Sequence, residues 1–366
     1  MLGLYIHIPF CDEVCYYCDF PKRIAKSNIK EKYIDSLLDE INFYRHLFPE
    51  VKSIYIGGGT PSSLNYELLE KLLCDLDLVV EEFTIECNPN DITDEFLNVL
   101  KRSNVNRISL GVQTFDDNHL KTIGRNHSKE LAFNSISKIK EYGFNLNIDL
   151  IYNIPGQTIE DLSSELEIVE SLNLDHISYY SLILEEKTVF DKLIKKDKLK
   201  VNEEDTDATM FNMIIHVLSN IGYNHYEISN YAKPGKESFH NKIYWNNQEY
   251  IGIGMSASGY LNGVRYHNSF LLNQYSDLVD DNGHSKVSET PITKNEKMFE
   301  HLMLGFRLLD GISIDKFNDL YNTDIFKEFE ELNKLANDEL IIIENGIIKL
   351  TKRGLFLNNE VLVRLI

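Results

Sequence analysis

The first half of the chain alternates short apolar runs with amphipathic segments, and this alternation constrains the fold more than any other feature. Strands are expected at 4–8, 53–56, 83–87, 107–110, 146–151 and 176–182. Helical patterns lie between them, near 29–47, 64–80, 93–103, 128–142 and 158–171. Six strand–helix units in succession predict a parallel sheet covered by helices.

Such a sheet can be an open, doubly wound sheet or a full or partial barrel, and periodicity does not separate these arrangements. The motifs described below favour an α/β fold with a partial (β/α)6 barrel of TIM type over residues 1–200. A connecting region, 201–294, begins with a helix near 203–221 and includes the Gly-rich turn GIGMSASG. Residues 295–366 are expected to form an α+β module of winged-helix type, because helices precede two β-branched runs around Asn345-Gly346, a hairpin signal.

Charge and composition exclude several classes of partner. The net charge is −20, so the surface as a whole repels nucleic acid and anionic lipid. Residues 295–366 hold nine Lys and Arg against thirteen Asp and Glu, which argues against DNA binding and favours a lid or docking surface there. No apolar run approaches the ~20 residues that span a bilayer. No signal-peptide pattern precedes the first strand, so we expect a cytoplasmic protein.

Three of the five cysteines form a cluster with the spacing C-x3-C-x2-C: Cys11, Cys15 and Cys18. An odd number of cysteines in a long chain argues against a disulfide framework. Three thiolates fit a [4Fe–4S] cluster whose fourth iron takes an exchangeable ligand. Zinc, which would need a fourth ligand at finger spacing, and a coincidental trio of buried cysteines are the alternatives. Cys74 and Cys87 are expected to be small core residues.

This cluster, with Tyr17 just before the last cysteine, resembles the signature of the radical S-adenosylmethionine (SAM) superfamily. The resemblance implies that the amino and carboxylate groups of SAM chelate the open iron. It also implies that an electron from the cluster cleaves SAM to methionine and a 5′-deoxyadenosyl radical. The protein would then supply placement of SAM and exclusion of oxygen and water.

Two further segments have the residue types of a ligand site. The stretch GGGTP, residues 57–61, follows an expected strand, and its glycines let backbone approach a ligand. It resembles the superfamily loop that holds the SAM amino group, although a tight turn is the simpler interpretation. Glu86 alternates with Ile85 and Cys87, which places its carboxylate on the opposite face of the strand, inside the barrel. An interior carboxylate needs a partner, such as a ligand hydroxyl or ammonium.

Gln113, Arg125 and Asp149 lie at or just beyond strand ends, where each alone is more often a structural hydrogen-bonding residue. The segments HIPFC, CYYCDF, GGGTPS, IECNP, GVQTF, NIDLIYNIPGQT, HNKIYW and MLGFRLLDG together resemble one family over essentially the whole chain. It is the family of the oxygen-independent coproporphyrinogen III dehydrogenase HemN and its relative HemW. The resemblance implies SAM contacts at Tyr5, Gly58, Gly59, Glu86, Gln113, Arg125 and Asp149, and a second SAM near Thr60.

The two branches of the family differ at particular residues. The dehydrogenase branch has a further cysteine two positions after the cluster, where Phe20 stands here, and a long N-terminal extension, whereas Cys11 is only ten residues from the start. The segment 240–245 matches the HNxxYW motif that is linked to haem binding in the HemW branch. A histidine can ligate haem iron and an aromatic ring can pack on a porphyrin. We therefore expect His240, Asn241, Tyr244 and Trp245 to contact haem, although a histidine beside an aromatic core anchor is the alternative interpretation.

The resemblance therefore implies a haem chaperone with a [4Fe–4S] cluster and SAM, which transfers haem to acceptor haemoproteins. An electron donor such as flavodoxin or ferredoxin and a homodimer complete the expected partners. The alternative function is the dehydrogenation of coproporphyrinogen III to protoporphyrinogen IX. His225 is the nearest rival of His240 as haem ligand, and Ser258 stands near the position where many HemW sequences have a histidine. No catalytic residue is assigned.

Overall fold

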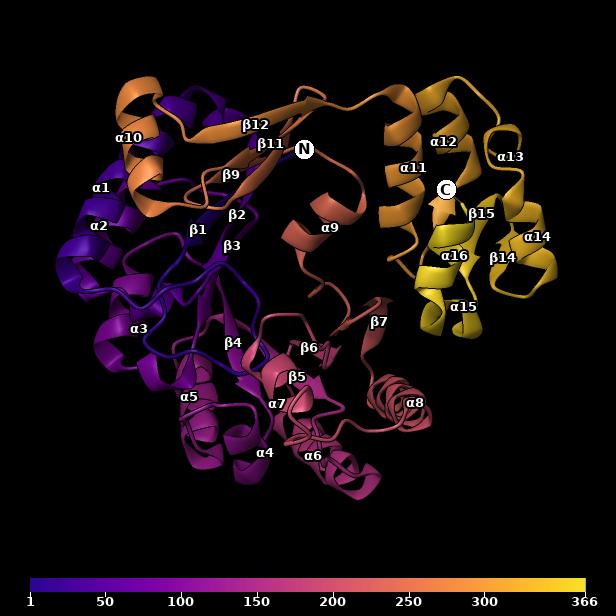
Figure 1. Cartoon of the computed structure of the whole chain (residues 1–366), viewed down its shortest axis with the longest axis horizontal. Coiled ribbons are helices and arrows are strands. Elements are labelled where there is room, and N and C mark those ends of the chain that lie inside the picture. The colour runs from indigo at the N-terminus through magenta and orange to yellow at the C-terminus, as the bar shows by residue number, and fades with distance from the viewer. Residues whose placement is uncertain (366) are drawn as a thin grey trace.

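The structure, a computed structural model, describes residues 1–365 and contains the expected strand–helix units (Figure 1). The barrel strands are β1 (Leu2–Ile8), β2 (Val51–Gly58), β3 (Glu82–Cys87), β4 (Arg107–Gln113), β5 (Asn145–Tyr152) and β6 (His176–Ser181). The helices after them are α1 (Ser27–Tyr44), α2 (Tyr66–Asp75), α3 (Asp94–Lys101), α4 (Asp117–Thr122), α5 (Lys129–Glu141), α6 (Ile159–Leu172) and α7 (Val189–Ile194).

Strands β1 to β6 are parallel neighbours in chain order, as in a TIM-type barrel, and they form the centre of a 12-stranded sheet. The sheet has two free edges, at β12 and at β7, so the barrel is open on one side. The fold is therefore the partial barrel that the motifs predicted.

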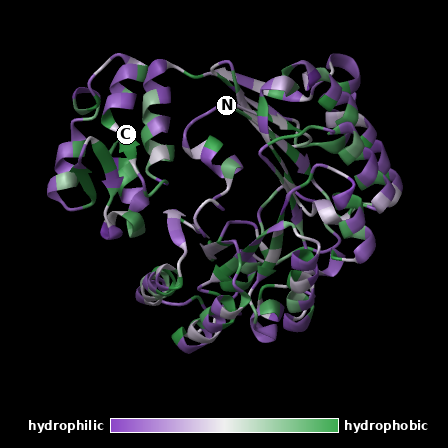
Figure 2. Cartoon of the chain, turned by 180° about the vertical axis from the view of Figure 1, so that it is seen from behind, coloured by the Kyte–Doolittle hydropathy of each residue, from purple (hydrophilic) through white to green (hydrophobic). Residues whose placement is uncertain are grey.

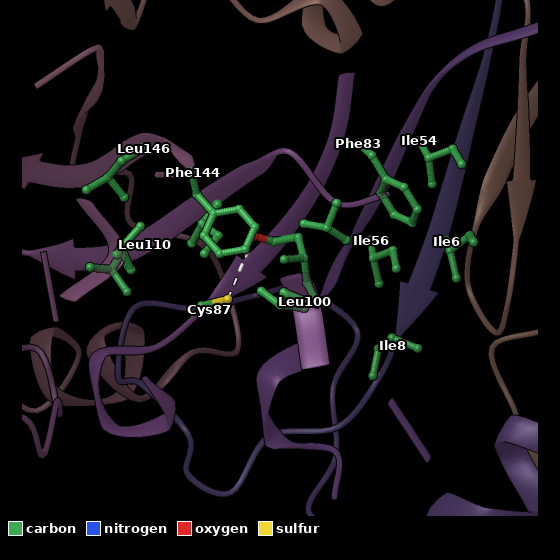
Figure 3. Packing of buried hydrophobic residues seen from close by; sticks show 14 of the residues in the cluster. Ile6, Ile8, Ile54, Ile56, Phe83, Cys87, Leu100, Leu110, Phe144 and Leu146 are labelled. Atoms are coloured by element: carbon green, nitrogen blue, oxygen red, sulfur yellow. Dashed lines mark hydrogen bonds between the residues drawn. The ribbon is translucent and has the colours of Figure 1, made fainter. Parts of the chain in front are cut away.

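The main core fills the space between the sheet and the helices. Strand side chains such as Ile54, Ile56 and Phe83 belong to one cluster with Leu100 of α3 and with Phe144, which directly precedes β5 (Figure 3). The barrel strands contain many apolar residues, while the helices alternate apolar and polar residues along their length (Figure 2). Burial of apolar area on this scale is the main force that holds the helices on the sheet.

The connecting region contributes more to the sheet than its sequence indicates. Its elements are α8 (Glu204–Asn220), β7 (Asn224–Glu227), β8 (Asn230–Ala232), α9 (Phe239–Trp245), β9 (Tyr250–Ile253), β10 (Ser258–Leu261), β11 (Val264–Asn268), α10 (Leu272–Asn282) and β12 (Lys286–Pro291). Strand β9 pairs in parallel with β1, and β8 pairs antiparallel with β6, so both edges of the barrel are extended. The strands of residues 201–294 thus belong to the same sheet as the barrel strands.

A buried carboxylate fastens this extension to the barrel. Glu40 of α1 is fully buried and accepts hydrogen bonds from the backbone N–H groups of Gly254 and Ser285 and from the Tyr275 hydroxyl. Burial raises the pKa of Glu40, while these donors lower it. The carboxylate therefore depends on its donors, and each donor depends on it.

The C-terminal module has a core of its own, which runs from Met298 to Leu365. It contains α11 (Lys294–Gly305), β13 (Ile312–Ser313), α12 (Ile314–Tyr321), α13 (Ile325–Glu328), α14 (Glu331–Asn337), β14 (Ile341–Glu344), β15 (Ile347–Leu350), α15 (Lys352–Phe356) and α16 (Asn358–Arg364). Asn345 and Gly346 both have positive φ in the hairpin turn, as the Asn-Gly pair predicts. The two helices that follow the hairpin were not expected from the sequence.

Within residues 1–365, none of the helices combines the length and the apolar character that crossing a membrane requires.

Candidate functional site

The cysteine segment and the carboxyl ends of the barrel strands enclose one cavity of about 640 Å³. Functional sites in barrels of this type lie at that end of the strands. Most of the residues selected from the sequence line the cavity: Cys11, Cys15, Cys18, Gly58, Gly59, Thr60, Glu86, Gln113, Arg125 and Asp149. Most of them come from the segment after β1 and from β2, β3, β4 and β5. Arg125 was expected at or just beyond a strand end, but it comes from the loop between α4 and α5. The fold thus brings together residues that are far apart in sequence.

The three thiols face this cavity from the loop between β1 and α1. Thr60 Oγ1 donates to the sulfur of Cys11, and an Arg125 amino group donates to the sulfur of Cys15, both at 3.4 Å. The thiolate is the form of cysteine that ligates iron. Within residues 1–365, no three His, Cys, Asp or Glu side chains converge as the ligands of a single metal ion would. A cubane cluster needs no such convergence, because each thiolate binds a different iron, and the donor set therefore fits [4Fe–4S].

The glycine loop after β2 holds the cysteine segment in place. The N–H of Gly59 donates to the carbonyl of Ile8 at 2.8 Å, and the N–H of Thr60 donates to that of Phe10 at 2.7 Å. A Cβ on Gly59 would lie 2.6 Å from the Phe10 carbonyl oxygen, so only glycine fits this approach. Gly58 has φ +116°, a conformation that also favours glycine. The loop therefore connects the SAM-type motif directly to the cluster motif.

Glu86 is a buried carboxylate group in the wall of the cavity. It accepts a hydrogen bond from the Tyr55 hydroxyl at 2.7 Å and one from the N–H of Gly58 at 3.1 Å. Burial raises the pKa of Glu86 to about 7, and the nearby charge of Asp149 adds to the effect. The expected alternation holds for Ile85, which is buried in the core, and Glu86, which lines the cavity, while the buried Cys87 also borders the cavity. A buried carboxyl with a raised pKa is stabilised in its ionised form by any ligand group that donates a hydrogen bond to it.

Asp149, within β5, is a second carboxylate that lines the cavity. It accepts from Ser109 Oγ at 2.9 Å and from Asn147 Nδ2 at 2.8 Å. Burial raises the pKa of Asp149, and the hydrogen bonds from Ser109, Ser178 and Asn147 lower it. Its environment is thus polar and preorganised before any ligand enters.

Arg125 and Gln113 complete the cavity wall. An Arg125 amino group donates to the carbonyl of Gly111 at 2.5 Å and to Asn88 Oδ1 at 2.9 Å, while its buried Nε has no partner among the described residues. Gln113 has φ +67°, a strained conformation for a residue with a side chain, at an irregularity in the β4–β5 pairing. Strain of this kind often marks ligand sites.

Tyr5 is placed differently from the other residues selected as SAM contacts. Its ring stacks on that of Tyr55, with centroids 6.2 Å apart, and its hydroxyl lies 2.9 Å from Nδ1 of His7. Tyr5 does not line the cavity, whereas Tyr55 does. The sequence did not indicate Tyr55 as a site residue, because one tyrosine in an apolar strand has no distinctive spacing. Its only signal is its position, two residues before the glycine loop.

The HNxxYW segment forms α9 at the other end of the barrel. The side chain of His240 is buried, and its ring nitrogens lie 2.7 Å from Ser53 Oγ and 2.8 Å from the Tyr244 hydroxyl. Burial lowers the pKa of His240 to about 3, so its ring is neutral. Trp245 packs under the guanidinium of Arg307, 4.4 Å from its ring centroid, and Asn241 lies in the first turn of α9. None of the four residues lines the cavity.

One expectation about the remaining cysteines was wrong. Cys74 is exposed, because the buried stripe of α2 consists of Leu68, Leu69, Leu72 and Leu73, and Cys74 lies one position beyond it. Cys87 is buried, as expected.

Comparison with known proteins shows which family has this fold and these motifs. The family model of the Radical SAM superfamily matches residues 5–168, and that of the HemN C-terminal domain matches residues 292–357. A solved structure described as coproporphyrinogen III oxidase (HemN) from Escherichia coli, a radical SAM enzyme, superposes with a TM-score of 0.87 and 25% identity. That superposition covers 100% of this chain and 89% of the other. Fold and site therefore define a radical SAM protein.

Curated relatives show to which branch of the radical SAM superfamily the chain belongs. A Heme chaperone HemW from Lactococcus lactis is 42% identical over 98% of this chain and 95% of its own length. A Heme chaperone HemW from Bacillus subtilis is 38% identical over 99% and 98%. The chain belongs to the HemW family of radical SAM proteins.

Proposed function

We propose that this chain is a haem chaperone, which binds haem and transfers it to acceptor haemoproteins. The observation that supports this most directly is its similarity, over nearly the whole length, to relatives named Heme chaperone HemW. The proposal includes a [4Fe–4S] cluster on Cys11, Cys15 and Cys18, and SAM in the adjoining cavity. It also includes a cytoplasmic location, where the compartment keeps thiols reduced.

Within the proposal, the residues of the cavity bind and orient SAM. Glu86 and the backbone of Gly58 and Gly59 face its amino acid part, and Asp149, Gln113 and Arg125 face the remainder. When bound, the cluster and SAM supply one-electron chemistry that side chains cannot provide. The chain's own contribution is the placement of donors and acceptors and the shielding of the cavity by the cysteine loop. Thr60 would contact a second SAM.

We propose that the haem ligand is His240 of the HNxxYW motif, with His225 as its nearest rival. For His240 to bind iron, it would have to give up its hydrogen bonds to Ser53 and Tyr244. His225 is also engaged, since its Nε2 lies 3.1 Å from the Ile228 carbonyl and its ring stacks on Tyr231.

The test of this proposal is haem binding followed by transfer. Soret spectra of the reconstituted chain should titrate to about one haem per chain, and the bound haem should move to an apo-haemoprotein. Variants His240→Ala and His225→Ala identify the ligand by the loss of the axial-ligand spectrum. A chain that binds haem no better than an unrelated acidic protein, or does not release it to the acceptor, refutes the proposal.

A second function is favoured by one observation, the close superposition on the HemN structure. In this alternative the chain converts coproporphyrinogen III to protoporphyrinogen IX. Phe20 stands where the dehydrogenase branch has a cysteine, so we expect no conversion in an assay run beside a true dehydrogenase. An electron donor such as flavodoxin or ferredoxin, and a homodimer, remain part of the proposal and are testable by cluster reduction and by sedimentation.

A further inference from the structure

Helix α9, which contains the HNxxYW segment, packs inside the open barrel near the beginnings of the strands. Its neighbours there are Gly3 of β1, Ser53 of β2 and Glu82, the first residue of β3. The carboxylate of Glu82 accepts hydrogen bonds from the N–H groups of Phe239 and His240 and from Ser238 Oγ, each at 3.0 Å. The first turn of α9 is therefore held by an anionic group of the barrel, which suits a helix N-terminus.

One line of contacts leads from His240 to the cavity. Ser53 and Tyr55 are two residues apart on β2 and face the same side of the sheet. The His240 ring bonds to Ser53 and lies over the Tyr55 ring, with centroids 5.2 Å apart. The Tyr55 hydroxyl donates to Glu86 at 2.7 Å. A single aromatic ring thus separates His240 from the cavity carboxylate.

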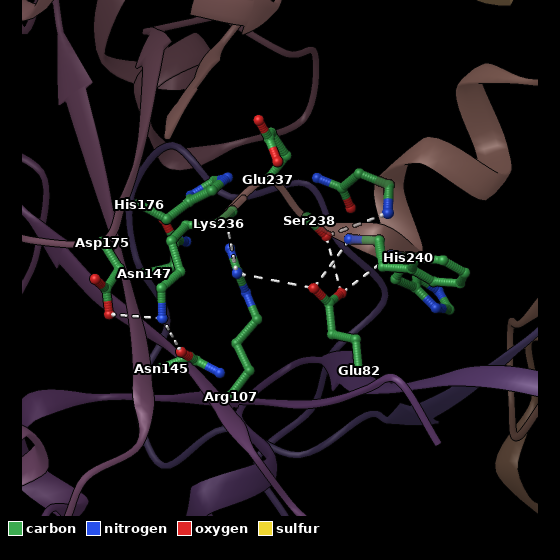
Figure 4. A network of polar contacts seen from close by, with 12 residues as sticks. Glu82, Arg107, Asn145, Asn147, Asp175, His176, Lys236, Glu237, Ser238 and His240 are labelled. Atoms are coloured by element: carbon green, nitrogen blue, oxygen red, sulfur yellow. Dashed lines mark hydrogen bonds and ion pairs between the residues drawn. The ribbon is translucent and has the colours of Figure 1, made fainter. Parts of the chain in front are cut away.

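A second line of contacts connects the same helix with Asp149. Asn147 donates to Asp149 at 2.8 Å, and its oxygen lies 2.6 Å from Nδ1 of His176. Nε2 of His176 lies 2.8 Å from the Tyr226 hydroxyl, which accepts from the N–H of Ser238, the N-cap of α9. Figure 4 shows Asn147, His176 and Ser238 of this path, beside the contacts of Glu82 with Ser238 and the first turn of α9. Glu86 and Asp149 are therefore both linked to α9 through chains of contacts.

We infer that His240 is a positioning residue of the SAM site, which holds Tyr55 and through it the Glu86 carboxylate. The HNxxYW segment then supports SAM binding from inside the barrel, whether or not it also binds haem. This inference rests on the proposed binding of SAM in the cavity and is independent of haem transfer. The neutral state of the ring is consistent with it, because a neutral imidazole donates on one nitrogen and accepts on the other.

Removing the imidazole would disturb this arrangement in two ways. Ser53 Oγ and the Tyr244 hydroxyl would each lose a buried partner, and a gap would open beside the Tyr55 ring. Tyr55 could then move away from Glu86, which would lose one of its two hydrogen bonds. The loss of one hydrogen bond to a charged group corresponds to roughly a tenfold weaker affinity or more.

The experiment measures SAM affinity on the full, anaerobically reconstituted chain without haem. Dissociation constants come from calorimetry and from the change in the EPR spectrum of the reduced cluster. His240→Ala and Tyr55→Phe should each raise the SAM dissociation constant about tenfold with the iron content unchanged. His240→Gln, which can still donate and accept, should recover most of the affinity. His301→Ala is the matched control, because it removes a comparable His–Tyr contact, 3.3 Å to Tyr321, in the C-terminal module.

The double variant His240→Ala/Tyr55→Phe distinguishes positioning from a general structural effect. If His240 acts through Tyr55, the double variant should bind SAM no more weakly than either single variant, whereas independent effects would multiply. If His240→Ala does not fold, His240→Leu, which also removes both hydrogen bonds but keeps more of the side-chain volume, replaces it in the single and double variants. Wild-type SAM affinity in every foldable His240 variant, or multiplicative effects in the double variant, overturns the inference. Haem titration of the same samples reports on the chaperone proposal separately.

Discussion

The unusual state of Glu86 predicts that SAM binding depends on pH. Its pKa is raised to about 7, so this carboxyl is mostly ionised at pH 8 and mostly protonated at pH 6. A protonated carboxyl accepts hydrogen bonds poorly, and binding of a donor must then displace the proton. Between pH 8 and pH 6 the SAM dissociation constant should therefore rise about tenfold, which corresponds to ~1.4 kcal/mol.

The amino group of SAM also titrates in this range, so the assay needs an internal reference. Glu86→Gln has no carboxyl to titrate, and its remaining pH dependence reports on the ligand and the cluster alone. The quantity to measure is the ratio of the dissociation constants of wild type and variant, from calorimetry at pH 6, 7 and 8. This ratio should change about tenfold across the range. A constant ratio would mean that Glu86 does not accept from SAM, and the placement of SAM in this cavity would lose its main support.

The same substitution should stabilise the protein at neutral pH. Because the folded pKa of Glu86 lies above the unfolded value, the folded chain retains a proton that the unfolded chain has released. The carboxyl therefore destabilises the fold increasingly as pH rises from about 4.5 to 7, by roughly 3 kcal/mol at most. Glu86→Gln should unfold at higher denaturant concentration than wild type at pH 8, and the difference should disappear near pH 4. A variant that is less stable at pH 8 would contradict this reasoning.

Three other substitutions have clear expected outcomes. Serine in place of any cluster cysteine should abolish iron binding and the absorption near ~400 nm, whereas Cys74→Ala should preserve both; retention of iron in any of the serine variants would reject the assigned ligands. Gly59→Ala should weaken SAM binding or disrupt the cluster, because its Cβ would meet the Phe10 carbonyl; an unchanged SAM titration would show that the loop can move. Glu40→Ala should lower the free energy of unfolding by at least about 3 kcal/mol in urea, because several buried donors lose their acceptor; a loss below 1 kcal/mol would mean that water replaces the carboxylate.

The parts of the fold that could be predicted are those with a strong local pattern. The parallel strands are buried on both faces and read as apolar runs, so their positions and order followed from the sequence. The strands that flank the barrel did not, because β7 and β9 have four residues each and contain Asn, His, Glu or Gly in place of a regular pattern. Their strand structure comes from pairing with β8 and β1, and such long-range pairing leaves no periodicity in the sequence.

The candidate site also contains residues that a local sequence pattern indicates and residues that no such pattern indicates. The cysteine spacing and the glycine loop are short motifs whose chemistry is local, and both line the cavity. Tyr55 and Ser109 also line it, but each is a single polar residue within a strand and has no neighbour that signals its role. The contact between Glu82 and the backbone of α9 joins residues more than 150 positions apart, so no local pattern could indicate it.

The position of the HNxxYW segment adds a physical argument about its role. In parallel barrels, side chains at the carboxyl ends of the strands bind ligands, while those at the amino ends stabilise the fold. Glu82, Arg107 and His176 are the first residues of β3, β4 and β6, and all three are buried around Ser238 and α9. A buried cluster of this kind is costly unless every member is paired, so it fixes α9 in one place. His240 is held there, yet its ring touches the tyrosine that holds Glu86. A motif at the structural end of the barrel can therefore influence the ligand end without contacting the ligand, which is why SAM affinity and haem affinity have to be measured separately in the same variants.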